Sequence, residues 1–198
     1  MSETLCAIVL AAGLGSRYRA VAGQHRNKLL AQCLGRDGTE RSVLEQVLVN
    51  VSALADKTVL LTRADYCSVA ELGLRHGYEV VVLDSPGMGD SIAAAVSAEP
   101  AHRGWLIALG DMPFIHADTL ERVARSVEDD AISVPVHAGR YGHPVAFGRA
   151  FGPALMALAG EKGAKRLFQG ARIKEIEVDD PGVLWDVDVP AVLTFQPR

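Results

Sequence analysis

The sequence predicts an α/β fold in which helices cover both faces of a mostly parallel sheet. Apolar runs of four to eight residues alternate with longer segments of helical periodicity, the pattern of successive strand–helix–strand units. With 198 residues, 49 % of them hydrophobic, the chain can bury a sizeable core and falls within the usual range of one domain. We therefore expect a single domain over residues 1–198.

Five short apolar runs are the predicted strands. They are Leu5–Leu10, Thr58–Thr62, Glu79–Leu83, Trp105–Leu109 and Ala131–Val136. A capping-box pattern at Ser42–Glu45 predicts a helix that runs to about Leu54. Asp65, Asp90 and His116 stand near the expected starts of three further helices.

The alternation of predicted strands and helices stops after Val136, the end of the fifth predicted strand. Gly139, Gly142 and Pro144 punctuate a segment typical of a hairpin or ribbon, and we expect a small acceptor-binding insertion there. The sequence from Arg149 onward predicts two short helices, a strand and a final turn. These are placed at about Arg149–Leu158, Glu161–Phe168, Ile173–Val178 and Trp185–Pro190.

Composition excludes several classes of function. The net charge is −4, and no clustered run of Lys or Arg predicts contact with a nucleic-acid backbone. The three cysteines, Cys6, Cys33 and Cys67, lack the pairing typical of zinc sites and are expected to be reduced thiols. No apolar run approaches the roughly 20 residues that span a bilayer, so we expect a cytoplasmic protein with no nucleic-acid or membrane partner.

The first strand leads into a loop of small residues that favours phosphate binding. The stretch from Leu10 through Ala11, Ala12, Gly13, Gly15 and Ser16 to Arg17 permits close approach of a ligand to the backbone. Successive N–H groups in such a loop can form an anion site at the end of the strand, and Arg17 and Lys28 would supply cations. Tyr18 stands where a dinucleotide fingerprint needs its last small residue, and no GxxxxGK[ST] string occurs. As plain structure, the glycines would simply turn the chain.

Two groups of carboxylates are candidate metal ligands. Asp111 follows a buried strand within Leu109–Pro113, where it could hold Mg²⁺ or cap the next turn. Asp186 and Asp188, at positions i and i+2, would point to one face if the segment is extended. They could anchor the same ion or form a solvated turn.

Two further segments bring polar groups to the expected site. Gly87, Met88, Gly89 and Ser91 stand at the start of an Ala-rich helix and could contact a base or ribose, or form a plain helix start. His143 lies in the glycine-punctuated insertion, and Lys165 lies near the start of a helix. A lone histidine is more often structural than functional.

Together these segments resemble the MobA-like family of nucleotidyltransferases, and most closely its branch of molybdenum-cofactor cytidylyltransferases. The resemblance covers most of the chain. It is carried by Leu10–Arg17, Asn27–Leu30, Gly87–Gly89 with Ser91, Leu109–Pro113, Gly142–Val145, Gly163–Ala164 and Asp186–Pro190. It implies a Rossmann-like three-layer fold that transfers CMP from CTP to the terminal phosphate of molybdopterin and releases pyrophosphate.

The resemblance also implies roles for individual residues. Arg17 and Lys28 would lie at the phosphates, and Asp111 would be the principal ligand of Mg²⁺, for which Mn²⁺ could substitute. Similarity to sugar-nucleotide pyrophosphorylases favours Asp186 as the second ligand, with Asp188 beside it. His143 and Lys165 would face the pterin acceptor, and an apo-molybdoenzyme would receive the product.

The segment between Arg17 and Lys28 departs from the family pattern. Tyr18–Arg26 makes this loop longer and more basic, so that Arg19 or Arg26 could share the role of Lys28. Gly35–Thr39 is expected to form an extended hairpin turn. Two rival functions stay open: the same fold acting on a sugar phosphate or another phosphorylated acceptor, and a non-catalytic carrier of the molybdenum cofactor.

Overall fold

A computed structural model describes residues 4–84 and 86–196. Its strands are β1 Leu5–Leu10, β2 Gln32–Leu34, β3 Glu40–Ser42, β4 Lys57–Thr62, β5 Glu79–Val82, β6 Gly104–Leu109, β7 Ala131–His137, β8 Arg140–Tyr141, β9 Val145–Gly148 and β10 Arg172–Glu177. Its α-helices are α1 Ser16–Ala22, α2 Val43–Ser52, α3 Cys67–Arg75, α4 Met88–Ala98, α5 Ala117–Arg125 and α6 Gly152–Met156. Short 3-10 helices are η1 Lys28–Leu30, η2 Arg149–Phe151, η3 Gly163–Phe168, η4 Pro181–Leu184 and η5 Pro190–Leu193.

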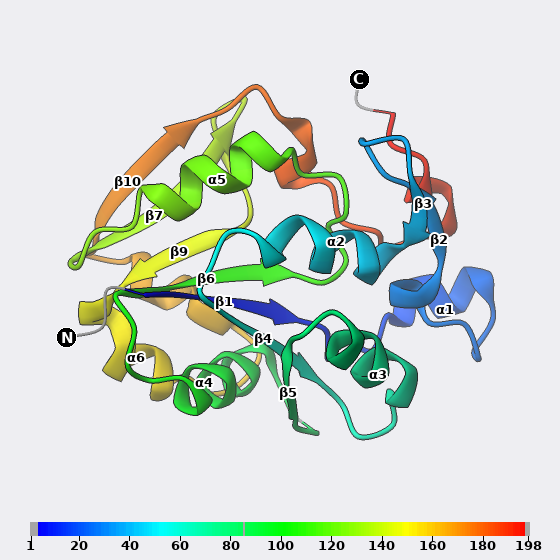
Figure 1. The fold of residues 1–198 in the computed structure, drawn as a ribbon, viewed down its shortest axis with the longest axis horizontal. Coiled ribbons are helices and arrows are strands. Elements are labelled where there is room, and N and C mark those ends of the chain that lie inside the picture. The colour runs from blue at the N-terminus through cyan, green and yellow to red at the C-terminus, as the bar shows by residue number, and fades with distance from the viewer. Residues whose placement is uncertain (1–3, 85, 197–198) are drawn as a thin grey trace.

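The central sheet has the strand order β10-β7-β9-β6-β1-β4-β5, with β8 paired to β7 (Figure 1). The pairs β10–β7, β6–β1, β1–β4 and β4–β5 are parallel, whereas β9 runs antiparallel to both β6 and β7. The expected mostly parallel sheet is therefore confirmed, and its parallel strands end on the same edge. Sites in open α/β sheets form at this carboxyl edge.

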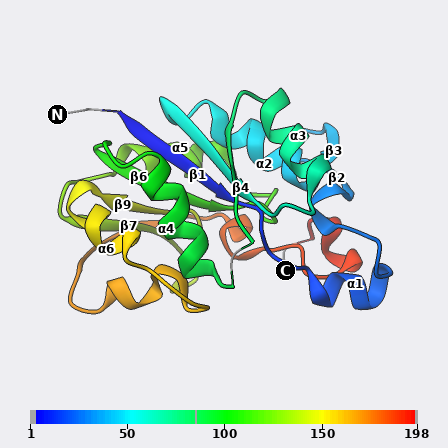
Figure 2. The ribbon, with the colours of Figure 1, turned by 90° about the horizontal axis from the view of Figure 1, so that it is seen from below.

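Each face of the sheet buries its own set of side chains, because successive residues of a strand point to opposite faces. Ala7 and Val9 of β1 pack with α2, α3 and α5, while Cys6 and Ile8 pack with α4 and α6. Figure 2 shows the same two helical layers from below. The expected three-layer α/β fold is confirmed. None of the described helices is long and apolar enough to cross a membrane.

The segment after β7 does more than form a surface hairpin. β8 pairs with β7 as expected for a hairpin, but β9 then inserts into the central sheet between β6 and β7. The two predicted tail helices are shorter than expected: η2 and α6 end at Met156, and the second is the 3-10 helix η3. Short 3-10 segments replace longer helices where few residues separate fixed points of the fold.

Another difference lies after the first loop. The stretch beginning at Ser16 was expected to be an extended loop, but α1 occupies Ser16–Ala22, with Gly15 as its N-cap. Tyr18 is the buried residue of this helix and packs in a small cluster with Val187. This tertiary contact explains why local sequence did not predict α1. The hairpin turn expected at Gly35–Thr39 is present between β2 and β3.

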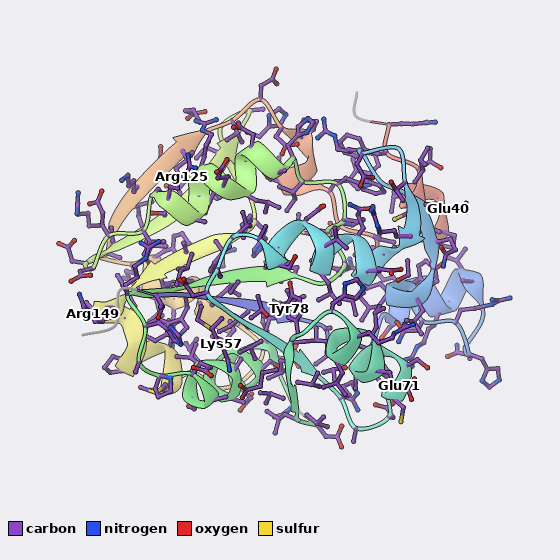
Figure 3. The ribbon with its side chains drawn as sticks, in the orientation of Figure 1. Glu40, Lys57, Glu71, Tyr78, Arg125 and Arg149 are labelled. Atoms are coloured by element: carbon purple, nitrogen blue, oxygen red, sulfur yellow. The ribbon has the colours of Figure 1, made fainter. Side chains whose placement is uncertain are left out.

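Charged side chains of both signs occur around the surface. Figure 3 labels Glu40, Glu71, Arg125, Arg149 and Lys57, which come from elements distributed around the molecule. By contrast, the aromatic ring of Tyr78 is buried under α2, where its hydroxyl donates a hydrogen bond to the carbonyl of Leu48 at 2.9 Å.

Candidate active site

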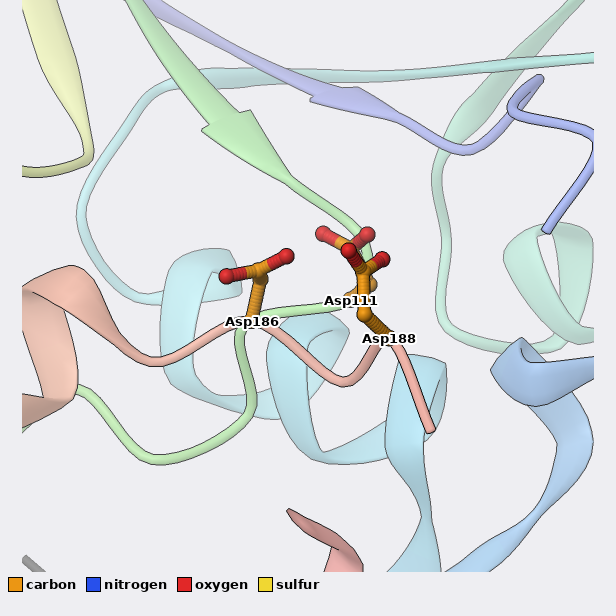
Figure 4. A group of neighbouring side chains, drawn as sticks. All are labelled: Asp111, Asp186 and Asp188. Carbon is orange, nitrogen blue, oxygen red and sulfur yellow. The ribbon is translucent and has the colours of Figure 1, made fainter. Parts of the chain in front are cut away.

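Three carboxylates converge at the carboxyl edge of the sheet (Figure 4). Asp111 follows the end of β6, and Asp186 and Asp188 lie in the segment after η4. One oxygen of each carboxylate lies within 4.8 Å of the others. The two segments are joined by the backbone, because Val187 donates its N–H to the carbonyl of Asp111 at 2.9 Å.

Two cations lie against these carboxylates. The ammonium of Lys28, at the start of η1, lies 2.6 Å from an oxygen of Asp111 and 3.0 Å from an oxygen of Asp188. Arg17 in the first turn of α1 also forms an ion pair with Asp188. The Lys28 side chain is 9 % exposed and that of Arg17 is 81 % exposed. Lys28 is thus an internal part of the cluster, whereas Arg17 is a solvent-exposed group at its rim.

The electrostatics of the cluster follow from this arrangement. Burial acts to lower the pKa of Lys28, but the neighbouring Asp111 and Asp188 outweigh it and raise that pKa. Burial and the charges of Asp188 and Asp111 raise the pKa of Asp186. Burial acts to raise the pKa of Asp188, but Lys28 and Arg17 lower it overall. The site therefore keeps Lys28 charged and carries excess negative potential at Asp186.

The donor set fits a hard divalent cation. Mg²⁺ and Mn²⁺ prefer carboxylate oxygens, and Asp111, Asp186 and Asp188 offer three within a few ångströms of one another. Two positive side chains face three carboxylates, so the balance still favours an added cation. All three residues named from the sequence as candidate metal ligands are brought together.

A cavity of about 350 Å³ lies beside this cluster, over the loop that follows β1. Of the residues expected to bind a nucleotide, its lining contains Leu10, Ala11, Ala12, Gly13, Gly87, Met88 and Ser91, together with Lys28 and Asp111. The cavity thus joins the small-residue loop, the start of α4 and the end of β6.

Gly15, Ser16, Arg17 and Gly89 are outside the lining of this cavity. Gly89 has a structural role, because a Cβ atom there would lie 2.8 Å from the carbonyl carbon of Ala159. The N–H of Gly89 also donates to the carbonyl of Gly160 at 2.8 Å. The start of α4 therefore packs directly on the loop that contains Ala159 and Gly160. The plain helix-start interpretation therefore accounts for Gly89.

Sequence reasoning missed two charged residues in the lining, Arg63 and Glu161. Arg63 directly follows β4, and its guanidinium lies 3.1 Å from an oxygen of Asp65. The rule that parallel strands end at the same edge could have indicated Arg63. Glu161 lies in the loop that packs on α4. Because this contact joins residues far apart in sequence, no local sequence pattern indicates that Glu161 reaches the cavity. That loop is fixed where the Gly160 N–H donates to the carboxylate of Asp90 at 2.8 Å.

A second cavity, of about 490 Å³, is lined by Ile92 of α4 and by residues of β6, β7, β9 and η3. His143 and Lys165 both line it, and the aromatic rings of Tyr141, Phe147 and Phe168 form much of its wall. The ring of Phe168 lies 6.0 Å from that of Tyr141 and 6.4 Å from that of Phe147. The two residues expected to face an acceptor thus share one largely apolar cavity.

His143 is partly buried in this wall. Its Nδ1 has no hydrogen-bond partner among the described residues. Burial lowers the pKa of His143, opposed by the negative charge of Asp111. The imidazole is therefore neutral near pH 7. Since an unpartnered acceptor costs less than an unpartnered donor, we assign the proton to Nε2.

Arg19 and Arg26 face a different cavity, which they line together with Tyr66. The guanidinium of Arg19 donates to the Tyr66 hydroxyl at 2.7 Å, and that hydroxyl donates to the carbonyl of Gly13 at 3.1 Å. Arg19 therefore supports the small-residue loop from behind. The role at the phosphates that was left open for Arg19 and Arg26 finds no support in this arrangement.

The fold and the site define a nucleotidyltransferase. The family model of the MobA-like NTP transferase domain matches residues 7–176, and the chain belongs to this family. A curated relative, the purine catabolism protein PucB of Bacillus subtilis, is 25 % identical over 164 residues. The match covers 71 % of this chain and 80 % of PucB.

Solved structures agree with this assignment. Rv0371c from Mycobacterium tuberculosis H37Rv is 27 % identical, with a TM-score of 0.78, and the match covers 97 % of this chain and 96 % of that one. A nucleotidyl transferase from Methanothermobacter thermautotroptrophicus has the same fold, with a TM-score of 0.79, 24 % identity, and coverage of 96 % and 94 %. Rv0371c has also been solved in complex with manganese, at a TM-score of 0.69, 27 % identity, and coverage of 90 % and 89 %.

Proposed function

We propose that this protein transfers CMP from CTP to the terminal phosphate of molybdopterin and releases pyrophosphate, with Mg²⁺ as its metal ion. The observation that carries the proposal is the pair of cavities, one over the small-residue loop at the carboxyl edge and one lined by aromatic rings. They lie next to each other along α4, since Ser91 lines the first and Ile92 the second. The proposal includes a cytoplasmic location and delivery of the product to an apo-molybdoenzyme.

The nucleotide is assigned to the first cavity. A triphosphate needs backbone donors and cations, and this cavity brings the loop at Ala11–Gly13 together with Lys28 and Arg63. The choice of CTP rests on the family resemblance, because the Leu-Ala-Ala-Gly form of the loop, with Ala12, resembles the CTP-using branch more than the GTP-using branch. Arg17, at the rim of the carboxylate cluster, would exchange its ion pair with Asp188 for contact with the phosphates.

The acceptor is assigned to the second cavity. A pterin is a flat conjugated ring system, which stacks favourably against aromatic side chains. The walls formed by Tyr141, Phe147 and Phe168 suit such a ring better than they suit a sugar, whose hydroxyl groups need many polar partners. Neutral His143 would donate a hydrogen bond from Nε2, and Lys165 would pair with the negative charge of the acceptor phosphate.

The reaction needs no covalent intermediate with the protein. An oxygen of the acceptor phosphate attacks the α-phosphorus of CTP and forms the new phosphorus–oxygen bond. The bond between the α-phosphorus and the bridging oxygen breaks, and pyrophosphate leaves with the electron pair. The loop N–H groups, Arg17 and Lys28 hold the phosphates in line and neutralise the developing charge.

Asp111, Asp186 and Asp188 would hold the divalent ion. When bound, this ion would neutralise charge on the phosphate oxygens of CTP. Lys28 must then give up part of its contact with Asp111 and turn to the phosphates, because both cations cannot occupy the same carboxylate oxygens. The manganese complex of Rv0371c supports a divalent ion in a protein of this fold.

The test measures pyrophosphate release from each of the four nucleoside triphosphates with Mg²⁺, with and without molybdenum-loaded molybdopterin. Wild type is compared with Asp111→Asn and with Asp129→Asn as the matched control, because Asp129 is an exposed aspartate paired with Arg149 at 2.5 Å. We expect release with CTP and the pterin in wild type and Asp129→Asn, and at least a roughly 100-fold loss in Asp111→Asn.

Two results would change the proposal in different ways. Release that proceeds with a sugar phosphate and not with the pterin would keep the nucleotide site and replace the acceptor. Wild-type turnover in Asp111→Asn would remove the metal assignment altogether.

A further inference from the structure

The three carboxylates depend on the relative position of two chain segments. Asp111 belongs to the segment that follows β6, and Asp186 and Asp188 belong to the segment that follows η4. Asp111 and Asp186 are 75 residues apart in sequence, and no covalent bond joins the two segments at the site. The distances between the carboxylates therefore depend on contacts that hold one segment against the other.

One buried carboxylate outside the cluster contacts both segments. Asp180 is 1 % exposed, and its two oxygens accept hydrogen bonds from both sides. One oxygen accepts the N–H of His116 at 2.8 Å, in the segment after Asp111. The other accepts the N–H of Gly182 at 3.0 Å, at the start of the segment that leads to Asp186. Asp180 thus fixes the two segments to each other.

The segments also touch directly at Gly182. A Cβ atom at this position would lie 2.1 Å from the carbonyl oxygen of Phe114, which leaves no space for any side chain. The close approach explains the glycine and places the Phe114 carbonyl next to Asp180.

A third segment, the turn between β2 and β3, supplies the positive charge that pairs with Asp180. Arg36 lies in the turn between β2 and β3, and its guanidinium donates to Asp180 at 2.7 Å and to the Phe114 carbonyl at 3.2 Å. The same guanidinium lies over the ring of Phe195, 4.7 Å from its centre. Figures 1 and 2 show the β2–β3 hairpin beside the C-terminal segment. A buried carboxylate needs such a partner to stay charged.

We propose that Arg36 and Asp180 are positioning residues for the divalent-ion site, which hold Asp111 at the correct distance from Asp186 and Asp188. This inference rests on the metal site of the proposed function. Neither residue belongs to the carboxylate cluster, so their effect is indirect. Partners of this kind, one layer outside the metal ligands, typically change metal affinity by about 10- to 100-fold when they are removed.

The test measures Mn²⁺ binding to the whole purified protein, by the electron paramagnetic resonance signal of free Mn²⁺. The variant is Arg36→Met, which keeps an apolar side chain of similar length and removes the guanidinium. The matched control is Arg41→Met, in the same hairpin, whose guanidinium pairs with Asp37 at 2.6 Å. Asp111→Asn identifies binding at the carboxylate cluster.

We expect Arg41→Met to bind Mn²⁺ as wild type does, and Arg36→Met to bind it about tenfold more weakly. Arg36→Lys should restore part of the affinity, because an ammonium can reach Asp180 but cannot donate to both partners in the same way. In turnover, the Mg²⁺ concentration for half-maximal rate should rise, while the rate at saturating Mg²⁺ stays near that of wild type.

A purely structural role would give a different result. If Arg36→Met lowers the melting temperature and binds Mn²⁺ with wild-type affinity, the positioning role is wrong. Should Arg36→Met fail to fold, Asp180→Asn takes its place, and wild-type Mn²⁺ affinity in Asp180→Asn would likewise overturn the positioning role. If Asp111→Asn binds Mn²⁺ as wild type does, the metal site itself is wrong, which separates failure of the proposed function from failure of this inference.

Discussion

The ammonium of Lys28 lies 2.6 Å from a carboxylate oxygen of Asp111, inside the group of carboxylates that is our candidate site for a divalent ion. A second contact, 3.0 Å to Asp188, fixes it there. The Lys28 ammonium therefore contacts carboxylate oxygens that a divalent ion would also need as ligands. The same residue has two expected effects, competition with the metal ion and stabilisation of the phosphates.

These two effects can be separated with Lys28→Gln. Without nucleotide, Mn²⁺ binding should become about tenfold tighter, because one positive charge close to two carboxylates is lost in a partly screened site. Turnover should nevertheless fall by about 100-fold, because a cation at the phosphates is lost as well. Mn²⁺ titration and initial rates measure the two effects.

The control for Lys28→Gln is Lys57→Gln. Lys57 also bridges two carboxylates, Glu79 at 2.8 Å and Glu99 at 2.9 Å, but it stands at the start of β4, at the amino edge of the sheet. Lys57→Gln should change neither Mn²⁺ affinity nor turnover. Weaker Mn²⁺ binding in Lys28→Gln would show that Lys28 supports the metal ion and does not compete with it.

The aromatic wall of the second cavity gives a prediction about the acceptor. Phe168→Ala removes a ring from the lining, and KM for the pterin should rise about tenfold while KM for CTP stays constant, since stacking on an aromatic ring contributes about 1–3 kcal/mol per ring system. Phe151→Ala is the control, because the Phe151 ring packs 6.0 Å from that of Phe147 and lies outside the lining. Equal changes in the two variants would argue against the acceptor assignment.

Burial of His143 predicts how stability depends on pH. Its pKa is lowered from the ordinary value of 6.5, so the folded protein keeps this imidazole neutral when the unfolded chain takes up a proton. The unfolded state then binds more protons, and the free energy of unfolding falls as the pH drops below 6.5. The loss from this one group is at most about 1.4 kcal/mol per pH unit.

Urea unfolding of wild type and His143→Gln between pH 7 and pH 5 measures this contribution. The variant should lose less stability over this range, because glutamine does not titrate. Parallel curves for the two proteins would mean that His143 does not contribute to the pH dependence.

The three thiols should differ sharply in reactivity. Burial raises the pKa of Cys6 to about 12 and that of Cys33 to about 11, so few of these groups are thiolates near neutral pH. Cys67 is exposed at the first position of α3. An aromatic disulfide reagent should therefore modify one thiol per native chain quickly and all three after unfolding. In Cys67→Ser the rapid phase should vanish, and its persistence would contradict the burial of the other two.

Local sequence predicted those parts of the protein whose signal lies within a few residues. The apolar run of β6, followed by Gly110 and a carboxylate, was sufficient to place Asp111 at the end of a strand. Ser42 begins α2 as expected, since its hydroxyl accepts the N–H of Glu45 at 3.3 Å. Asp186 and Asp188 were candidates because two carboxylates so close in sequence suggest a cation.

The features that were missed depend on residues distant in sequence. α1 forms where Tyr18 packs near Val187, and Glu161 reaches the first cavity because its loop packs on α4. The insertion of β9 between β6 and β7 likewise pairs strands that no local pattern connects. Lys28 was expected to supply a cation at the phosphates, and its contact with Asp111 joins positions 83 residues apart.

The two cavities are lined mainly by different parts of the sequence. Most of the lining of the first cavity comes from residues up to Asp111, whereas that of the second comes largely from Tyr141 onward, on β8, β9 and η3. Under the assignment proposed above, substitutions within the later stretch would change the choice of acceptor while the loop after β1 keeps its sequence. Under the proposed assignment, the protein would combine a fixed nucleotide-binding part with an exchangeable acceptor-binding part, and related chains could serve new acceptors by changing a single contiguous stretch.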